Sequence, residues 1–321
     1  MDSFYNTFDI EPIKPTIQLG DSLIFVGSCF SDEISNRASK SGLSVTANPF
    51  GTVFHPLSIF KSISDAIHDE QEVDICQKDD LFFHWDSSGK IYGLTQESLR
   101  EKIHDKRSIL KNELKKASHL FLTFGTARGH YLKNEKLPVA NCHKMPRSLF
   151  DEKLASMEEI VSNFKVLYQE LKNLNSSLQL VLTVSPVRHL RDGFVENNRS
   201  KARLLLACEE MSKLNDVHYF PVYEWVVDSL RDYRFFKEDG IHPNEQAVNF
   251  IWKKMQSCFF DKETVAVMQE VQRIYQGLNH QILYPESEQA KKHQQAMKSQ
   301  LEKLTNAHPT ICWDSILGKN Q

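Results

Sequence analysis

The chain has 321 residues, of which 40% are hydrophobic and 25% are charged, with a net charge of −3 from 42 acidic and 39 basic residues. This suits a globular protein with a sizeable core, in one large domain or two smaller ones. The balanced charge gives no indication of a nucleic-acid partner, and no apolar stretch is long enough to span a bilayer.

The first strand and helix of the chain are predicted directly after an irregular lead-in at residues 1–20. Residues 23–26 are an apolar, strand-forming run, Gly27 makes a turn, and Phe30, Ile34 and Ala38 follow at helical spacing. Ser28 and Cys29 therefore lie where a strand ends and a helix begins. Free backbone N–H groups and the helix dipole at such a junction stabilise an oxyanion or a thiolate.

Residues 45–56 are predicted to be a loop, because Pro49, Gly51 and Pro56 interrupt them. A helix is expected over 56–68, where His55 would cap it, followed by a β-hairpin over 82–92 and an amphipathic helix over 98–117. We expect the region of about 57–117 to be an insertion between the first two core units.

The remaining core elements alternate between buried strands and amphipathic helices. Strands are predicted at 119–124, 178–184 and 217–220, and helices at 151–174, 200–214, 223–230 and about 245–259. This alternation predicts an α/β fold, a doubly wound and mostly parallel three-layer sandwich. Polar constellations follow three of the strands, at 27–29, 125–128 and 185–189, so a functional site is expected at that edge of the sheet.

A second motif lies near the end of the core, in residues 238–244 (Glu-Asp-Gly-Ile-His-Pro-Asn). Asp239 stands three residues before His242 at a helix start, which supplies a general base and its orienting carboxylate in one loop. Helix capping is the alternative use of both residues. We expect residues 1–261 to form the α/β domain and 262–321 a helical appendage, with helices at 264–278 and 287–304, that covers the site, packs on the core or forms a homodimer contact.

Together the two motifs resemble the SGNH (GDSL-like) hydrolase superfamily, with its early Gly-x-Ser nucleophile turn and late Asp-x-x-His. Residues 27–31 (Gly-Ser-Cys-Phe-Ser) are closer still to the Gly-Ser-Cys-Phe-Ala signature of the GSCFA family, and residues 140–144 and 185–189 also resemble that family. The resemblance implies a flavodoxin-like, SGNH-type sandwich. It puts Cys29 at the nucleophile position, as a thiol partly ionised by the helix start, with Ser28 as the alternative.

The resemblance also implies an oxyanion site. Gly51 is the candidate for the glycine of the second SGNH block, although an ordinary turn glycine is an equal interpretation. The Gly-x-Asn-Asp block is absent, because Ala127 and Arg128 stand in its place, and Asn141 is the candidate replacement donor, with His143 beside it. Basic residues after the strands, including Arg128, Arg188 and His189, would as a group clamp an anionic substrate.

Two function classes follow. The first is an esterase, deacylase or acyltransferase that forms an acyl-enzyme on a small-molecule or glycan ester, with His242 as base and Asp239 orienting it. The second is a non-catalytic binding module on the same scaffold. No cofactor or metal is expected, since adjacent residues such as Cys142 and His143 rarely chelate together. Six scattered cysteines and the absence of a signal-peptide pattern in residues 1–15 favour a cytoplasmic location.

Overall fold

The computed structural model describes residues 6–133, 138–279, 283–313 and 316. Its centre is a parallel sheet with the strand order β11-β10-β6-β1-β2. The strands are β1 (Ser22–Gly27), β2 (Ser44–Ala47), β6 (His119–Phe124), β10 (Gln179–Val184) and β11 (Val217–Tyr219). Counted along the sheet strands alone this is the order 2-1-3-4-5 of doubly wound, flavodoxin-like folds, so the predicted fold class is confirmed.

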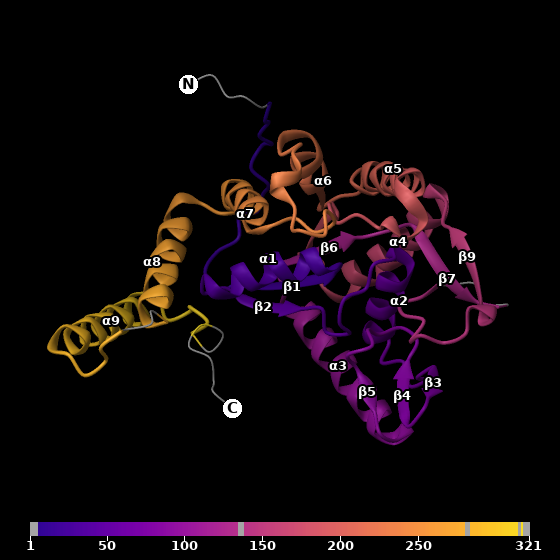
Figure 1. Ribbon diagram of the computed structural model, residues 1–321, viewed down its shortest axis with the longest axis horizontal. Helices are drawn as coiled ribbons and strands as arrows, with labels where there is room; N and C mark the ends of the chain where they lie inside the picture. The colour runs from indigo at the N-terminus through magenta and orange to yellow at the C-terminus, as the bar shows by residue number, and fades with distance from the viewer. Residues whose placement is uncertain (1–5, 134–137, 280–282, 314–315, 317–321) are drawn as a thin grey trace.

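Helices cover both faces of this sheet (Figure 1). One face packs against α1 (Cys29–Lys40) and α7 (Glu245–Phe259), and the other against α2 (Pro56–Ile67), α3 (Gln96–Lys116), α4 (Met157–Leu174) and α5 (Gly193–Met211). The three central strands, β1, β6 and β10, are buried along their whole length. Helices on both faces explain why these strands are continuous apolar runs.

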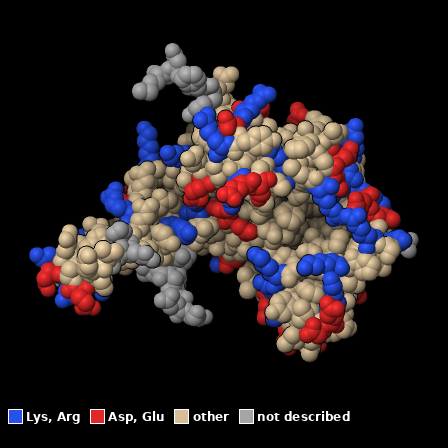
Figure 2. Space-filling model, viewed as in Figure 1, with Lys and Arg blue, Asp and Glu red and all other residues tan. Residues whose placement is uncertain are grey.

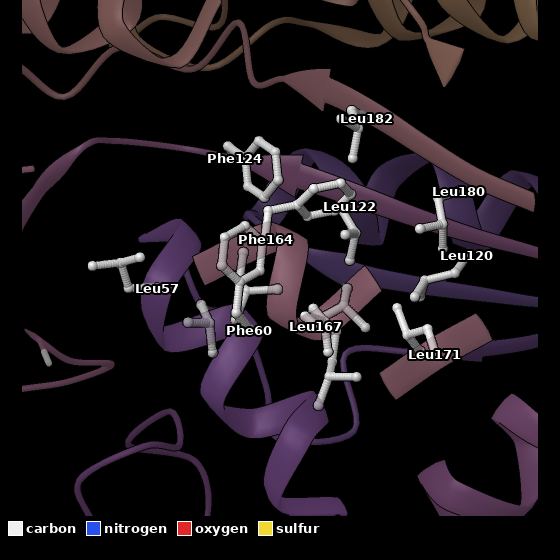
Figure 3. Close-up of a cluster of buried hydrophobic side chains, with 14 of the residues drawn as sticks. Leu57, Phe60, Leu120, Leu122, Phe124, Phe164, Leu167, Leu171, Leu180 and Leu182 are labelled. Carbon is white, nitrogen blue, oxygen red and sulfur yellow. The ribbon is translucent and has the colours of Figure 1, made fainter. Parts of the chain in front are cut away.

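The larger hydrophobic cluster joins the sheet to α2 and α4 (Figure 3). Phe60 of α2 lies between Phe124 of β6 and Phe164 of α4, with ring centroids 5.7 and 5.6 Å apart. Burying one such side chain stabilises the fold by about 1.5–3 kcal/mol. The packing fixes the carboxyl end of β6, beside which β1 ends at Gly27.

Two segments differ from the sequence-based expectation. Residues 45–47, predicted as loop, belong to the edge strand β2, which pairs with β1 in parallel. The helix predicted to begin at Asp151 begins at Met157, because Phe150–Leu154 forms strand β9 and pairs with β7 (Arg128–Leu132). In both cases pairing with a distant strand decides the structure of a short segment whose own pattern is ambiguous.

Two small antiparallel sheets stand beside the core. The predicted hairpin is confirmed as β4 (Leu81–His84) and β5 (Tyr92–Gly93), and β3 (Ile75–Lys78) adds a third strand. The second sheet is formed by β7, β8 (Pro138–Val139) and β9. Both sheets lie on the side of the molecule that carries α2 and α4 (Figure 1).

The last part of the described chain is helical, as predicted. After α6 (Val222–Glu224), a π-helical segment (Trp225–Ser229) and α7, the chain continues into α8 (Lys262–Leu278) and α9 (Glu288–Ala307). These two helices project from the body (Figure 1) and form a cluster of their own, which includes Val271, Ile274 and Leu304. None of the described helices has an apolar stretch sufficient to cross a membrane.

Candidate active site

The turn after β1 leaves no space for a side chain at Gly27. This residue has a φ of +145°, and a Cβ there would lie 2.2 Å from the Thr123 carbonyl oxygen. Its N–H donates to Asn48 Oδ1 at 2.8 Å, and the Ser28 N–H donates to the Thr123 oxygen at 3.1 Å. The close approach of β1 to β6 therefore requires glycine, and it fixes the position of the residue that begins α1.

Cys29 is the first residue of α1 and is partly exposed, whereas Ser28 before it is fully buried. The N–H groups of Cys29 and Phe30 face the sulfur and favour the thiolate. Burial and the nearby carboxylate of Asp32 outweigh them, so the net effect raises the pKa of the Cys29 thiol. The prediction of a thiol partly ionised by the helix start is therefore wrong, and Cys29 needs a base to lose its proton.

Asp239 and His242 form an ordered pair on the loop that precedes α7. His242 Nδ1 lies 2.7 Å from Asp239 Oδ2, while Asp239 Oδ1 accepts from the N–H groups of Ile241 and His242. These hydrogen bonds hold the pKa of Asp239 well below its usual range. An ionised Asp239 orients the imidazole with its Nδ1 proton toward the carboxylate, which leaves Nε2 for proton transfer.

Arg188 holds this loop in place. Its guanidinium donates to the Gly240 carbonyl at 2.8 Å and lies over the rings of Tyr233 and Phe236, 5.0 and 4.2 Å from their centroids. Through these contacts the side chain supports the backbone between Asp239 and His242. The expected substrate clamp at Arg188 stays a prediction.

Cys29, Asp239 and His242 line one pocket of about 360 Å³. Phe30, Val187, Pro243 and Val248 supply apolar walls, and Glu33 of α1 pairs with Lys237 at 3.3 Å across its rim. Figure 2 shows acidic side chains gathered over α1, next to a hollow in this face of the molecule. The structure thus brings together the two motifs that lie more than two hundred positions apart in the chain.

The predicted oxyanion donors are not part of this pocket. The Gly51 N–H already donates to the Asn48 carbonyl at 2.7 Å, and a Cβ at Gly51 would meet Ser88 Oγ. Asn141 Oδ1 accepts from the N–H of His143, whose Nε2 lies 2.8 Å from the His84 carbonyl oxygen. The Gly51 N–H thus closes a turn and is not free for an oxyanion. Asn141 and His143 fasten their loop to the β3–β5 sheet, and their expected roles at an oxyanion site stay predictions.

The proposed anion clamp is likewise not assembled. Arg128 pairs with Asp192 and Glu196 at 3.4 and 2.5 Å, so its charge is balanced within the protein. His189 is turned inward against Phe54, and burial lowers its pKa to about 3. A neutral histidine and a paired arginine give an anion little attraction.

Two residues near the site, Asn48 and Lys201, were not identified from the sequence. Asn48 links the turn to α1, since it accepts from Gly27 and donates to Asp32 at 2.6 Å. Lys201 of α5 is 1% exposed and donates to the carbonyls of Gly125 and Ser185, both at 2.6 Å. The sequence contains a signal for the burial of Lys201, because this residue lies at helical spacing from Leu204, Cys208 and Met211, on the apolar face of the helix. Among the residues that the structure describes, no cluster of three His, Cys, Asp or Glu side chains could hold a metal.

Comparisons with known proteins were made by sequence and by structure. A model of the GSCFA family matches residues 22–255. A search of curated proteins found no match. Among solved structures, the chain is similar to a carbohydrate esterase family 3 protein from Talaromyces cellulolyticus, with 6% identity and a TM-score of 0.37 over 78% of this chain and 99% of that one.

Proposed function

The chain belongs to the GSCFA family across residues 22–255, and we propose that it is an SGNH-like esterase that forms an acyl-enzyme at Cys29. The observation that carries the proposal is the single pocket lined by Cys29, Asp239 and His242, with the imidazole ordered by its 2.7 Å contact to Asp239. Nucleophile, base and orienting carboxylate are the three groups that acyl transfer requires.

In the proposed reaction His242 Nε2 takes the thiol proton, and the sulfur attacks the acyl carbonyl carbon. The N–H groups of Cys29 and Phe30, which face the sulfur, are the donors available to the oxyanion. The imidazolium then returns the proton to the departing alkoxide, which leaves a thioester on Cys29. Water, deprotonated by His242, attacks that thioester and releases the carboxylic acid and the free thiol.

Cys29 is proposed as nucleophile over Ser28 because Ser28 is fully buried whereas Cys29 lines the pocket. The test is incubation with slow ester substrates and a fluorophosphonate, followed by intact-mass measurement and peptide mapping. Cys29→Ala should abolish the adduct, Cys29→Ser should retain some, and Ser28→Ala should retain most. Cys142→Ala is the matched control, since Cys142 is also a partly exposed cysteine whose pKa is raised by burial. An adduct on Ser28 would move the nucleophile back by one residue.

A binding module on the same scaffold is the second candidate. It is favoured by the engagement of the Gly51 N–H with Asn48, which removes one of the expected oxyanion donors. An oxyanion site with few donors costs rate, because one lost donor typically costs a hundredfold or more. If no probe modifies Cys29 while a ligand still protects it from alkylation, the binding module is the better conclusion. Transfer to an acceptor other than water, a small-molecule or glycan substrate, a cytoplasmic location and a homodimer through α8 and α9 stay predictions.

A further inference from the structure

Lys201 is a buried lysine whose ammonium lies at the carboxyl ends of the central strands. It extends from α5 to the carboxyl ends of two central strands, where Nζ donates to the carbonyls that directly follow β6 and β10, those of Gly125 and Ser185. Within the described part of the chain, Nζ has no carboxylate in salt-bridge range. Nζ also lies over the ring of Tyr223, 6.0 Å from its centroid. A buried ammonium balanced by carbonyl dipoles and a ring face is costly, and a nearby negative charge would offset part of that cost.

The sheet register places this cation at the edge of the sheet where the Cys29 turn lies. Gly27 pairs with Thr123 on β6, and Phe124 pairs with Val184 on β10, so the residues that follow all three strands share one edge. Cys29 lies two residues after Gly27, and Gly125, whose carbonyl accepts from Lys201 Nζ at 2.6 Å, lies two residues after Thr123, the partner of Gly27. A negative charge on the sulfur raises the pKa of Lys201, in keeping with this placement. Lys201 and His242 both disfavour a charge on His189, so these groups belong to one electrostatic cluster.

We propose that Lys201 is a positioning residue that stabilises the negative charge formed at Cys29 when the thiol loses its proton. The inference rests on the proposed role of Cys29, but it concerns the sulfur and needs no substrate. The other charged groups around Cys29 are Asp32 and Glu33 of α1, which oppose a thiolate, and Lys237, Asp239 and His242 of the opposite loop. Because Lys237 is paired with Glu33 and His242 with Asp239, Lys201 is the cation among them without a carboxylate partner.

The coupling predicts a distinctive pH profile for reaction of Cys29 with iodoacetamide, a neutral electrophile that reports the thiolate. Burial lowers the pKa of Lys201 to about 7. Below that pH Lys201 is charged and favours ionisation of the thiol, so the alkylation rate rises with pH. Above it the tendency of the thiol to ionise still increases, but the fraction of charged Lys201 falls by the same factor, and the two changes cancel. The rate should rise to about pH 7, level off, and rise again only where the thiol ionises alone.

The experiment uses the full chain with His242→Ala, so that the proposed base takes no part in deprotonating the thiol. Peptide mass spectrometry follows alkylation of Cys29 between about pH 5 and 10, the range that spans both ionisations. Adding Lys201→Met should abolish the inflection and slow the reaction about threefold to tenfold at neutral pH, with no difference at the highest pH. Lys201→Arg should restore much of the rate.

Lys172→Met is the matched control. Lys172 also donates to two carbonyls, those of Ser176 and Leu178, but at the opposite end of β10. Equal slowing by Lys172→Met, or an unchanged profile in Lys201→Met, would overturn the inference. If Lys201→Met does not fold, as judged by circular dichroism, the His242→Ala profile still decides, since a single rise without an inflection is incompatible with the coupling. A failed ester-trapping experiment with this inflection present would instead reject only the esterase.

Discussion

Replacing Gly27 with alanine tests whether the close approach of β1 and β6 builds the site. The new Cβ would lie 2.2 Å from the Thr123 oxygen and 2.8 Å from its carbonyl carbon, where real Cβ contacts stay above 3.0 Å. Both atoms belong to the backbone of a buried central strand, so no side-chain rotation relieves the overlap. The strands must separate.

The cost has three sources. A side chain at a φ of +145° is strained by about 1–3 kcal/mol, and overpacking adds about 1–3 kcal/mol. The hydrogen bonds from Gly27 N–H to Asn48 and from Ser28 N–H to Thr123 contribute about 1 kcal/mol each and would be weakened. We expect a loss of about 4–8 kcal/mol, which approaches the whole stability of an ordinary domain.

Thermal unfolding followed by circular dichroism measures this loss, and we expect a Tm at least about 10 °C below that of the natural protein. Gly193→Ala is the control, because Gly193 also has a positive φ, +86°, but a Cβ there would meet nothing within 4 Å. It should cost only the backbone strain of about 1–3 kcal/mol. Equal Tm values for the two variants would refute the argument from strand approach.

Two further predictions concern ionisable groups. Asp239→Asn removes the carboxylate that orients His242, and should slow adduct formation on Cys29 about a hundredfold or more. Asp232→Asn, which replaces the aspartate that caps the nearby Arg234 amide, should leave that rate unchanged. Burial lowers the pKa of both His55 and His119 to about 4, below the value of 6.5 in the unfolded chain. The unfolded state therefore binds more protons in this interval, and the free energy of unfolding should fall by several kcal/mol between about pH 6.5 and 4. Urea unfolding midpoints that do not move with pH over that interval would contradict this.

Local patterns in the sequence were sufficient to predict the core strands and helices of the fold. The apolar runs of β1, β6 and β10 and the stripes of α1, α4 and α7 agree with the structure, because burial on both faces leaves a strong record in the sequence. Strand β9 was missed because the helical spacing of the next helix extends back to Leu154, while its partner β7 is distant in sequence. Such pairings are decided by tertiary context.

The two motifs of the site could be predicted from the sequence, but the charge partners and pKa shifts of its side chains could not. The Ser28–Cys29 junction and the Asp239–His242 spacing are local features that the residues themselves reveal. The roles of Arg128 and Arg188 depend on partners from the start of α5 and from the loop before α7. The direction of the Cys29 pKa depends on burial by elements from the whole domain, and no window of sequence contains that information.

The separation in the chain between Cys29 and its proposed base also has a meaning for the newly made protein. A nucleophilic thiol that ionised by itself would be open to oxidation as soon as β1 and α1 had formed. Here the proposed base arrives more than two hundred residues later, on the loop that closes onto α1 through the Lys237–Glu33 pair. On this proposal, base-assisted reactivity at Cys29 requires the completed fold, and a partly synthesised domain lacks it.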